Sequence, residues 1–126
     1  MTPNQIKNAY RAIQELSGVV FPYRVARGIA ALKKRLLEEV EAVAAMESAL
    51  VEKYGGKIDR AGNAKVSGEN AQAFVDEYNA MMEQNDESIQ LPVVDVSAFA
   101  DTLRISPNVV GWLEGIVLFE EVKNDG

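Results

Sequence analysis

The feature that most constrains this chain is a long stretch of helix-forming residues, 22–54. Its apolar side chains recur at steps of three, four or seven residues, which places them on one face of a helix. They are Val25, Ile29, Leu32, Leu36, Val40, Val43, Leu50 and Tyr54. Pro22 suits the first turn of a helix, and Gly55 and Gly56 provide a left-handed stop. We therefore expect one amphipathic helix, ~46 Å long at a rise of ~1.5 Å per residue.

Such a helix is longer than the domain it should belong to. The chain has 126 residues and is read as a single domain, 1–126. A compact domain of this size has a radius of gyration of roughly 14 Å and a diameter of about 36 Å. Either the helix protrudes, or a second copy of the chain covers its excess apolar stripe. The sequence therefore predicts self-association through the long helix, as a dimer or a higher oligomer.

A shorter helix is predicted at the N-terminus. Thr2 and Gln5 have the spacing of a capping box, and Pro3 takes the first helical position. Residues 17–18, Ser-Gly, end this helix. Its apolar face consists of Ile6, Ala9, Tyr10, Ile13 and Leu16. This helix and the long one should form an antiparallel hairpin.

The stretch after the long helix, residues 57–68, indicates a turn between two short arms. Asp59 and Asn63 are residue types that bind calcium, but Gly62 is misplaced for a calcium loop and no glutamate follows at the required distance. We therefore predict a structural turn. Its arms are residues 57–58 and 65–66.

A third helix is expected from a cap at Ser67 through about Gln84. Its inward face would consist of Ala71, Phe74, Val75, Tyr78 and one of the pair Met81 and Met82. A stripe of methionine and aromatic residues at helical spacing is typical of a core, and we interpret it so rather than as a cofactor site.

The C-terminal third predicts smaller elements. Residues 89–93 alternate apolar and polar side chains and include Pro92, which indicates an edge strand that pairs with the hairpin arms. Asp95 or Ser97 should cap a short helical turn. A last helix begins at residues 106–107, Ser-Pro, with an inward face of Val109, Val110, Trp112 and Leu113. Residues 116–122 fit a helix or a strand, and 123–126 a frayed tail.

These elements define the expected fold class, which is α+β and mainly α. It consists of an antiparallel helical hairpin with one long central helix, a third helix, a small antiparallel β element and a C-terminal helix. No apolar run approaches the ~20 residues that span a membrane. The N-terminus also lacks the pattern of a signal peptide, so a cytoplasmic protein is expected.

The composition excludes several chemistries. The chain has no cysteine and no histidine. Disulfides, thiolate zinc sites, histidine-ligated metals and histidine general bases are therefore excluded. Catalysis would have to use carboxylates, lysine, tyrosine or a metal held by oxygen ligands. We expect a protein that is not an enzyme and needs no cofactor.

The net charge of −6 conceals an asymmetry. Residues 1–57 carry nine basic and six acidic side chains, whereas residues 58–126 carry four basic and thirteen acidic ones. An acidic total counts against binding to duplex nucleic acid. A local basic patch on an acidic body suits a small anionic ligand, or a partner that contacts one end.

The candidate binding site consists of Tyr23, Arg24 and Arg27. Neither arginine has an acidic residue three or four positions away on the helix. Both occupy the first turns, where the helix dipole disfavours each cation by ~0.3–1 kcal/mol. No capping side chain precedes them, so a bound anion would meet free amides and two guanidinium groups. Alternatively, acidic residues of the C-terminal half pair with them: Glu69, Asp101 or Glu114.

Three acidic pairs could be taken for a catalytic dyad or a magnesium site. They are Asp76 with Glu77, Asp86 with Glu87, and Glu120 with Glu121. None has a supporting spacing or motif, and we interpret them as solvated surface.

Several segments carry a family resemblance. They are VVFPYRVARGIAALKKRL at 19–36, VEKYGGK at 51–57, DRAGNAKV at 59–66, SIQLPVVDVSAF at 88–99 and RISPNVVGWLEGI at 104–116. In their pattern and order the chain resembles a family of small uncharacterised proteins, a domain of unknown function, encoded by phages and prophages of Gram-positive bacteria. The most specific segments are 22–27, 54–55 with 62–63, and 106–107. The resemblance implies a phage accessory protein in the host bacterial cell.

Two functions follow as hypotheses. The first is a non-enzymatic binding protein that counteracts host defence, by sequestering a small anionic, nucleotide-like signal or by blocking a defence protein. The second is a structural or chaperone-like accessory factor in phage particle assembly, for which the long helix and the edge strand would be protein-binding surfaces.

Overall fold

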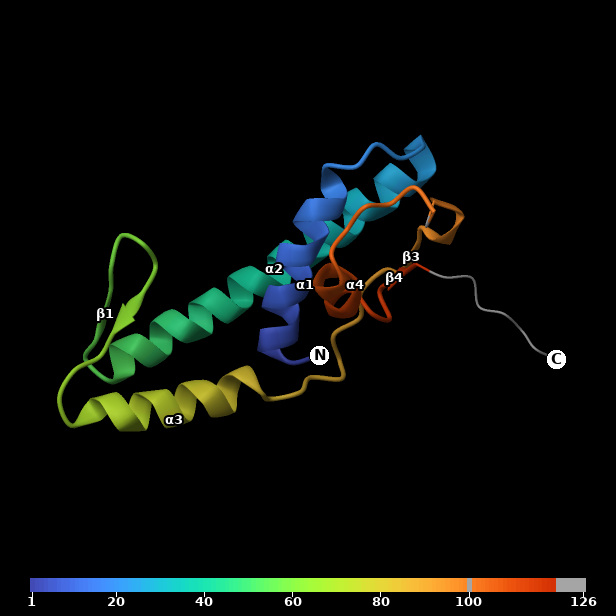
Figure 1. Ribbon diagram of the computed structural model, residues 1–126. Helices are drawn as coiled ribbons and strands as arrows, with labels where there is room; N and C mark the ends of the chain where they lie inside the picture. Colours follow the sequence, from blue (N-terminus) through green and yellow to red (C-terminus); the bar gives the residue numbers. More distant parts are fainter. Residues whose placement is uncertain (100, 120–126) are drawn as a thin grey trace.

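The computed structural model describes residues 1–99 and 101–119 (Figure 1). Its helices are α1 (Pro3–Ser17), α2 (Tyr23–Lys53), α3 (Asn70–Met82) and α4 (Pro107–Trp112), with a short 3-10 helix, η1 (Ser97–Phe99). Its strands are β1 (Lys57–Ile58), β2 (Ala64–Lys65), β3 (Val94–Asp95) and β4 (Val117–Leu118). The predicted class, α+β and mainly α with one long central helix, is confirmed.

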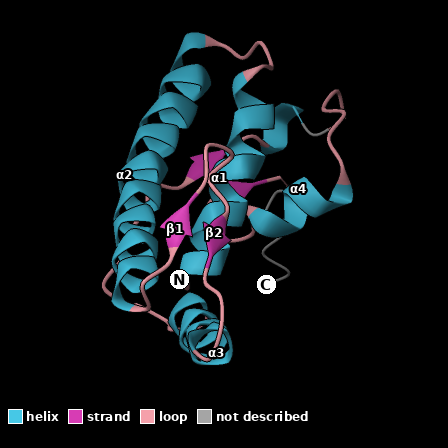
Figure 2. Ribbon diagram, turned by 90° about the vertical axis from the view of Figure 1, so that its left-hand side faces the viewer, coloured by secondary structure: helices cyan, strands magenta, loops and turns pink. Residues whose placement is uncertain are grey.

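Helix α2 is the axis of the molecule. With 31 residues it is ~46 Å long. Figure 1 shows α1 along its N-terminal half and α3 along its C-terminal half, with the β1–β2 hairpin beyond its last turn. Figure 2 shows the same arrangement with α3 seen nearly end-on. The predicted antiparallel hairpin of the first two helices is confirmed, and the protein is elongated because so few elements lie beside so long a helix.

Local hydrogen bonds explain where the helices begin and end. Thr2 and Gln5 form the predicted capping box at the start of α1. At the end of α2, Gly55 has a φ of 68°. The N–H of Gly55 donates to the Glu52 carbonyl at 3.0 Å, and that of Gly56 to the Val51 carbonyl at 2.9 Å. These two bonds are those of a Schellman motif, which satisfies the last carbonyls of the helix.

The main core lies under the N-terminal half of α2. Its buried members come from α1, α2, the β3 region, α4 and β4: Ala9, Ala12, Ile13, Leu16, Phe21, Ile29, Leu32, Leu36, Val94, Val96, Val109, Leu113 and Val117. Strands β3 and β4 pair in parallel, with Val94 opposite Val117. Phe21 packs edge-on against Phe99 at 5.6 Å between ring centroids. This core holds the C-terminal part of the described chain, from β3 to β4, against the α1–α2 hairpin.

A smaller contact joins the C-terminal half of α2 to α3. Val43, Leu50 and Val51 are buried on the α2 side, but Met82 is the only buried residue of α3. Phe74 stacks on Tyr78 at 5.8 Å and meets Tyr54 edge-on at 6.2 Å.

The apolar stripe of α2 is therefore largely covered within a single chain, by α1, α3 and the main core. Self-association through this helix stays a prediction. The cover that α3 provides removes the strongest reason for it, since the excess stripe was expected to need a second copy.

Three predictions about the middle of the chain are wrong. Residues 89–93 form no strand and do not pair with the β1–β2 hairpin. The strand is instead β3, two residues long, which pairs with β4. Ser67 does not cap α3, which begins at Asn70 with no side-chain cap. Val75 is 45% exposed, because it lies off the narrow face with which α3 packs against α2 and α1.

The last helix is confirmed in part. Ser106 caps it, and Val109 and Leu113 are buried on one face. Val110 and Trp112 were predicted to face inward, but they are 36% and 37% exposed. In so short a helix only residues four apart share the buried face, so the neighbouring positions turn outward. Of the segment left open, 117–118 are strand, and 120–122 and the predicted tail lie outside the described residues.

Asp95 is the residue that caps the short helical turn, since its carboxylate accepts from the N–H of Ser97 at 2.9 Å. The predicted turn between two short arms is confirmed, with the second arm at Ala64–Lys65, one residue before its predicted place at 65–66. The Asp59 carboxylate accepts from the N–H groups of Ala61 and Asn63 at 3.0 and 2.9 Å. Within the described chain, no helix is both long and apolar enough to cross a membrane.

Candidate functional site

The three predicted site residues lie together at one exposed corner, where the α1–α2 loop meets the first two turns of α2. We call Val20, Tyr23, Arg24 and Arg27 the α1–α2 corner. Val20 is 97% exposed and Tyr23 is 80% exposed, and both arginines are exposed. Val20 was not among the residues predicted for the site. Its neighbours Val19 and Phe21 face the core.

The first N–H groups of α2 have few hydrogen-bond acceptors within the described residues. The N–H groups of Val25 and Ala26 both donate to the Pro22 carbonyl at 3.0 Å. Pro22 offers no capping side chain. No described residue accepts from the N–H groups of Tyr23 and Arg24. Two free amides and two guanidinium groups therefore share this corner, which favours an anionic partner.

The alternative in which the arginines pair internally finds no support in the described residues. Ion pairs among residues 1–99 and 101–119 join Lys7 to Glu47, Arg35 to Glu38 and Glu39, and Lys53 to Glu77. None involves Arg24 or Arg27. Glu69, Asp101 and Glu114, the proposed internal partners, form no ion pair with them.

The shape of the corner limits what it can hold. A hollow of about 470 Å³ is bounded by Tyr23, Arg24, Arg27, Gly28 and Ala31. All of these residues belong to α2, so the hollow lies on one helix face and has no opposing wall. Such a surface suits contact with another macromolecule better than enclosure of a small ligand, which usually needs a concave pocket.

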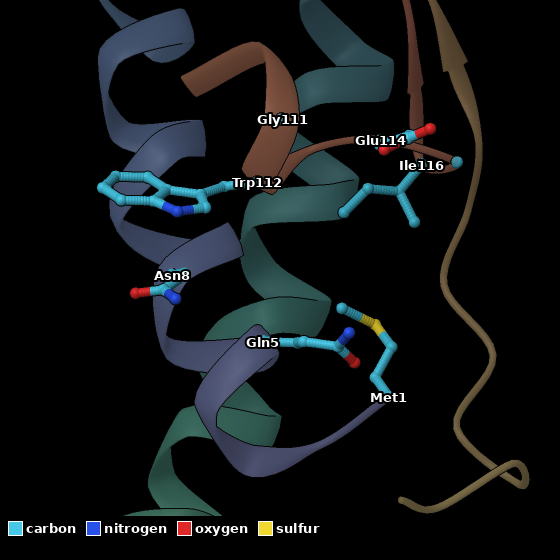
Figure 3. Close-up of a pocket in the computed structure, with 8 residues that line it drawn as sticks. Met1, Gln5, Asn8, Gly111, Trp112, Glu114 and Ile116 are labelled. Atoms are coloured by element: carbon cyan, nitrogen blue, oxygen red, sulfur yellow. The ribbon is translucent and has the colours of Figure 1, made fainter. Parts of the chain in front are cut away.

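A second hollow, between α1 and α4, was not foreseen from the sequence. It has a volume of about 490 Å³ and is lined by Met1, Gln5, Asn8, Gly111, Trp112, Glu114, Gly115 and Ile116. Figure 3 shows the indole of Trp112 beside α1, on the side of Asn8. The Gln5 side chain is already bound to the N–H of Thr2 at 2.9 Å. The sequence does contain one indication of this hollow. Val109 and Leu113 are four residues apart and share the buried face of α4, which places Trp112 on a different face.

Polar groups also meet at the end of α2. The Glu77 carboxylate accepts from the Lys53 ammonium at 2.8 Å and from the Tyr54 hydroxyl. These hydrogen bonds, first from Lys53 and then from Tyr54, lower the pKa of Glu77. The hydrogen bond to Glu77 raises the pKa of Lys53 and that of Tyr54. All three groups keep their ordinary charge states at neutral pH, so this cluster clamps α3 to α2 and is not arranged for proton transfer.

A similar link crosses three helices. Glu47 of α2 accepts from the Tyr78 hydroxyl of α3 at 3.2 Å and pairs with Lys7 of α1 at 3.3 Å. In the part of the chain that the structure describes, no three acidic side chains gather in a way that could hold a metal ion. Of the acidic residues predicted to be solvated surface, Asp76, Asp86 and Glu87 are exposed, whereas Glu77 is half-buried and paired with Lys53. Glu120 and Glu121 lie outside the described residues.

Comparison of the sequence with known protein families, with curated proteins and with solved structures finds no match. The functional argument therefore depends on the surfaces of this molecule.

Proposed function

We propose that this chain is a non-enzymatic binding protein that contacts an acidic surface of another protein through the α1–α2 corner. The observation that supports this most directly is the exposure of Val20 and Tyr23 beside two arginines that have no ion-pair partner among the described residues. Tyrosine and arginine are enriched among the few residues that supply most of the binding energy of protein interfaces. The phage family that the sequence resembles suggests the setting, in which the partner is a host defence protein in the bacterial cytoplasm.

A small anionic, nucleotide-like signal is the second candidate ligand. The two free amides and two guanidinium groups favour it, since phosphate is bound at helix N-termini through such groups. The missing wall of the hollow counts against it. A role in phage particle assembly has no observation of its own at this corner.

The test is a plating assay in Gram-positive strains that restrict a phage. Expression of this chain should restore plating, and the double variant Arg24→Ala, Arg27→Ala should not. A charge-assisted hydrogen bond contributes ~1.5–3 kcal/mol, so each arginine removed should weaken binding ~10- to 100-fold. The matched control is Lys33→Ala, Lys34→Ala, which removes the same charge from the same helix.

Two results would contradict the proposal. One is equal plating with the two double variants when both are folded by circular dichroism. The other is that expression of this chain restores plating in none of the Gram-positive strains tested. A thermal shift with linear and cyclic nucleotides separates the candidates, because a shift that is lost in Arg24→Ala, Arg27→Ala would assign the corner to a nucleotide.

A further inference from the structure

An apolar groove runs between α2 and α3, far from the α1–α2 corner. It consists of two adjoining hollows of about 460 and 620 Å³, which share Met46, Met81 and Gln84. We call this the α2–α3 groove. One end reaches Met1 and Ile89, and the other reaches Lys53 and Glu77.

Both helices line the groove with residues at the spacing of a helix-packing surface. On α2 they are Glu39, Ala42, Val43, Met46, Ala49, Leu50 and Lys53. On α3 they are Glu77, Ala80, Met81 and Gln84, the last just beyond the helix end. Steps of three and four residues form one continuous stripe on each helix. The alanines allow a third backbone to approach closely. At one end, Met1, Pro3 and Ile6 from the start of the chain also line the groove.

The methionines of the chain gather here. Met1, Met46 and Met81 line the groove, and Met82 is buried in the same contact between α2 and α3. The chain contains four methionines in all, so none lies elsewhere. Methionine adapts its shape to different partners and is frequent on surfaces that bind helices. Met46 is 43% exposed, an apolar area that the described chain leaves uncovered.

The charge around the groove indicates which kind of helix fits it. Residues 38–53 contain five acidic side chains and one basic one, and residues 66–87 contain six acidic and no basic ones. These two segments contain the residues with which α2 and α3 line the groove, and together they carry a net charge of −10. Of their acidic residues, Glu39 and Glu47 are paired with Arg35 and Lys7. A basic helix would gain complementary charge along both rims, and an acidic one would be repelled.

We propose that the α2–α3 groove binds a basic amphipathic helix of a partner protein, with its apolar face on Met46 and Met81. The stripe on α2 spans residues 39–53, which corresponds to a helix of ~14 residues and ~21 Å. Recognition of this kind places residues at i, i+3, i+4 and i+7 in the groove.

A second copy of this chain does not supply such a helix. Its basic helical segment, residues 24–35, has five basic and no acidic side chains. The apolar residues of that segment, Ile29 and Leu32, are 3% and 0% exposed because they face the main core. The segment cannot turn them toward a groove without unfolding, so the occupant is a different protein.

The test uses a fluorescently labelled peptide of ~14 leucines and lysines, with leucine at i, i+3, i+4 and i+7. Fluorescence anisotropy with the full chain should give saturable binding that weakens as salt rises. Met46→Gln, Met81→Gln should weaken it ~10-fold or more, because two apolar contacts are lost while chain length and helix propensity are kept. The matched control is Val75→Gln on the exposed face of α3, for which binding should change less than about twofold.

Several outcomes would overturn the inference. They are no binding of the leucine–lysine peptide, equal binding of a leucine–glutamate or a scrambled leucine–lysine peptide, and equal affinity of the groove variant and Val75→Gln. A dimer in sedimentation that Met46→Gln, Met81→Gln converts to a monomer would show that a second copy occupies the groove. If the leucine–lysine peptide shifts amide NMR signals only in α3 and the C-terminal half of α2, the inference is supported.

Discussion

At the scale of single residues, Gly56 is the described glycine at which an added Cβ atom would be most crowded. A Cβ atom there would lie 2.6 Å from the Lys65 carbonyl oxygen and 3.1 Å from Cγ1 of Val51. Gly56→Ala should therefore push the β1–β2 hairpin away from the end of α2. We expect a loss of ~1–3 kcal/mol in the free energy of unfolding, as for other overpacked sites. Urea unfolding followed by circular dichroism measures it.

The control for this substitution is a glycine with free space around it. A Cβ at Gly111 in α4 would meet nothing within 4 Å. Gly111→Ala should be neutral or raise the free energy of unfolding by ~0.5–1 kcal/mol, since alanine favours a helix. Equal destabilisation by the two substitutions would show that the close approach at Gly56 has no energetic weight.

Most of the residues that act through their immediate neighbours were predictable from the sequence, with Ser67 as the exception. Thr2 with Gln5, Ser106 and the stop at Gly55 depend on contacts within a few residues, and each was predicted correctly. The orientation of Trp112 was not, because an aromatic side chain can be covered or left open by elements distant in sequence. The positions of Arg24 and Arg27 were predictable because they depend on the local start of α2. The α2–α3 groove was missed because it depends on how elements distant in sequence pack together.

At the scale of elements, the attachment of α3 should depend on pH through Glu77. Its pKa lies below the ordinary 4.5 because Lys53 and Tyr54 donate to it. The stabilisation is therefore complete above pH 4.5 and is lost as the pH falls through the lowered pKa. The pKa values of Lys53 and Tyr54 lie above their ordinary 10.5 and 10.0. The stabilisation is therefore also lost as the pH rises through those raised values. Amide NMR signals of α3 should shift at both extremes before those of α1.

Glu77→Gln removes this acid dependence and should loosen α3 at neutral pH as well. The matched control is Asp76→Asn, which changes the adjacent carboxylate, bound only by the Gln72 amide at 2.9 Å among the described residues. If α3 of Glu77→Gln still detached in acid as the unmodified chain does, another group would control the contact.

The existence of the helices was predictable from periodicity, but the strand pairing was not. Residues 89–93 have the alternation of a strand, yet β3 lies one residue further on and pairs with β4, far along the sequence. The N–H of Val94 donates to the carbonyl of Ile116 at 2.9 Å, a contact that no local pattern encodes. Such pairings depend on which partner the folded core brings near.

At the scale of the whole molecule, α2 connects two parts of unequal packing. The main core draws on α1, the first half of α2, α4 and both members of the β3–β4 pair, and none of its buried residues belongs to α3. The other part, α3 on the second half of α2, buries few residues and includes the exposed ion pair of Lys53 with Glu77. The α1–α2 corner lies on the well-packed part and the α2–α3 groove on the other, so the groove can open without disturbing the corner.

This division predicts two levels of local stability. Amides of α1 and of residues 29–36 should exchange hydrogen only through global unfolding, whereas those of α3 should exchange through local opening. We expect protection in α3 to be lower by at least ~10-fold, a difference of ~1.4 kcal/mol. Met82→Ala, at the one buried position of α3, should lower protection there and leave α1 unchanged. Equal protection in all the helices would instead show a single cooperative unit, in which a partner bound at the groove would stabilise the corner as well.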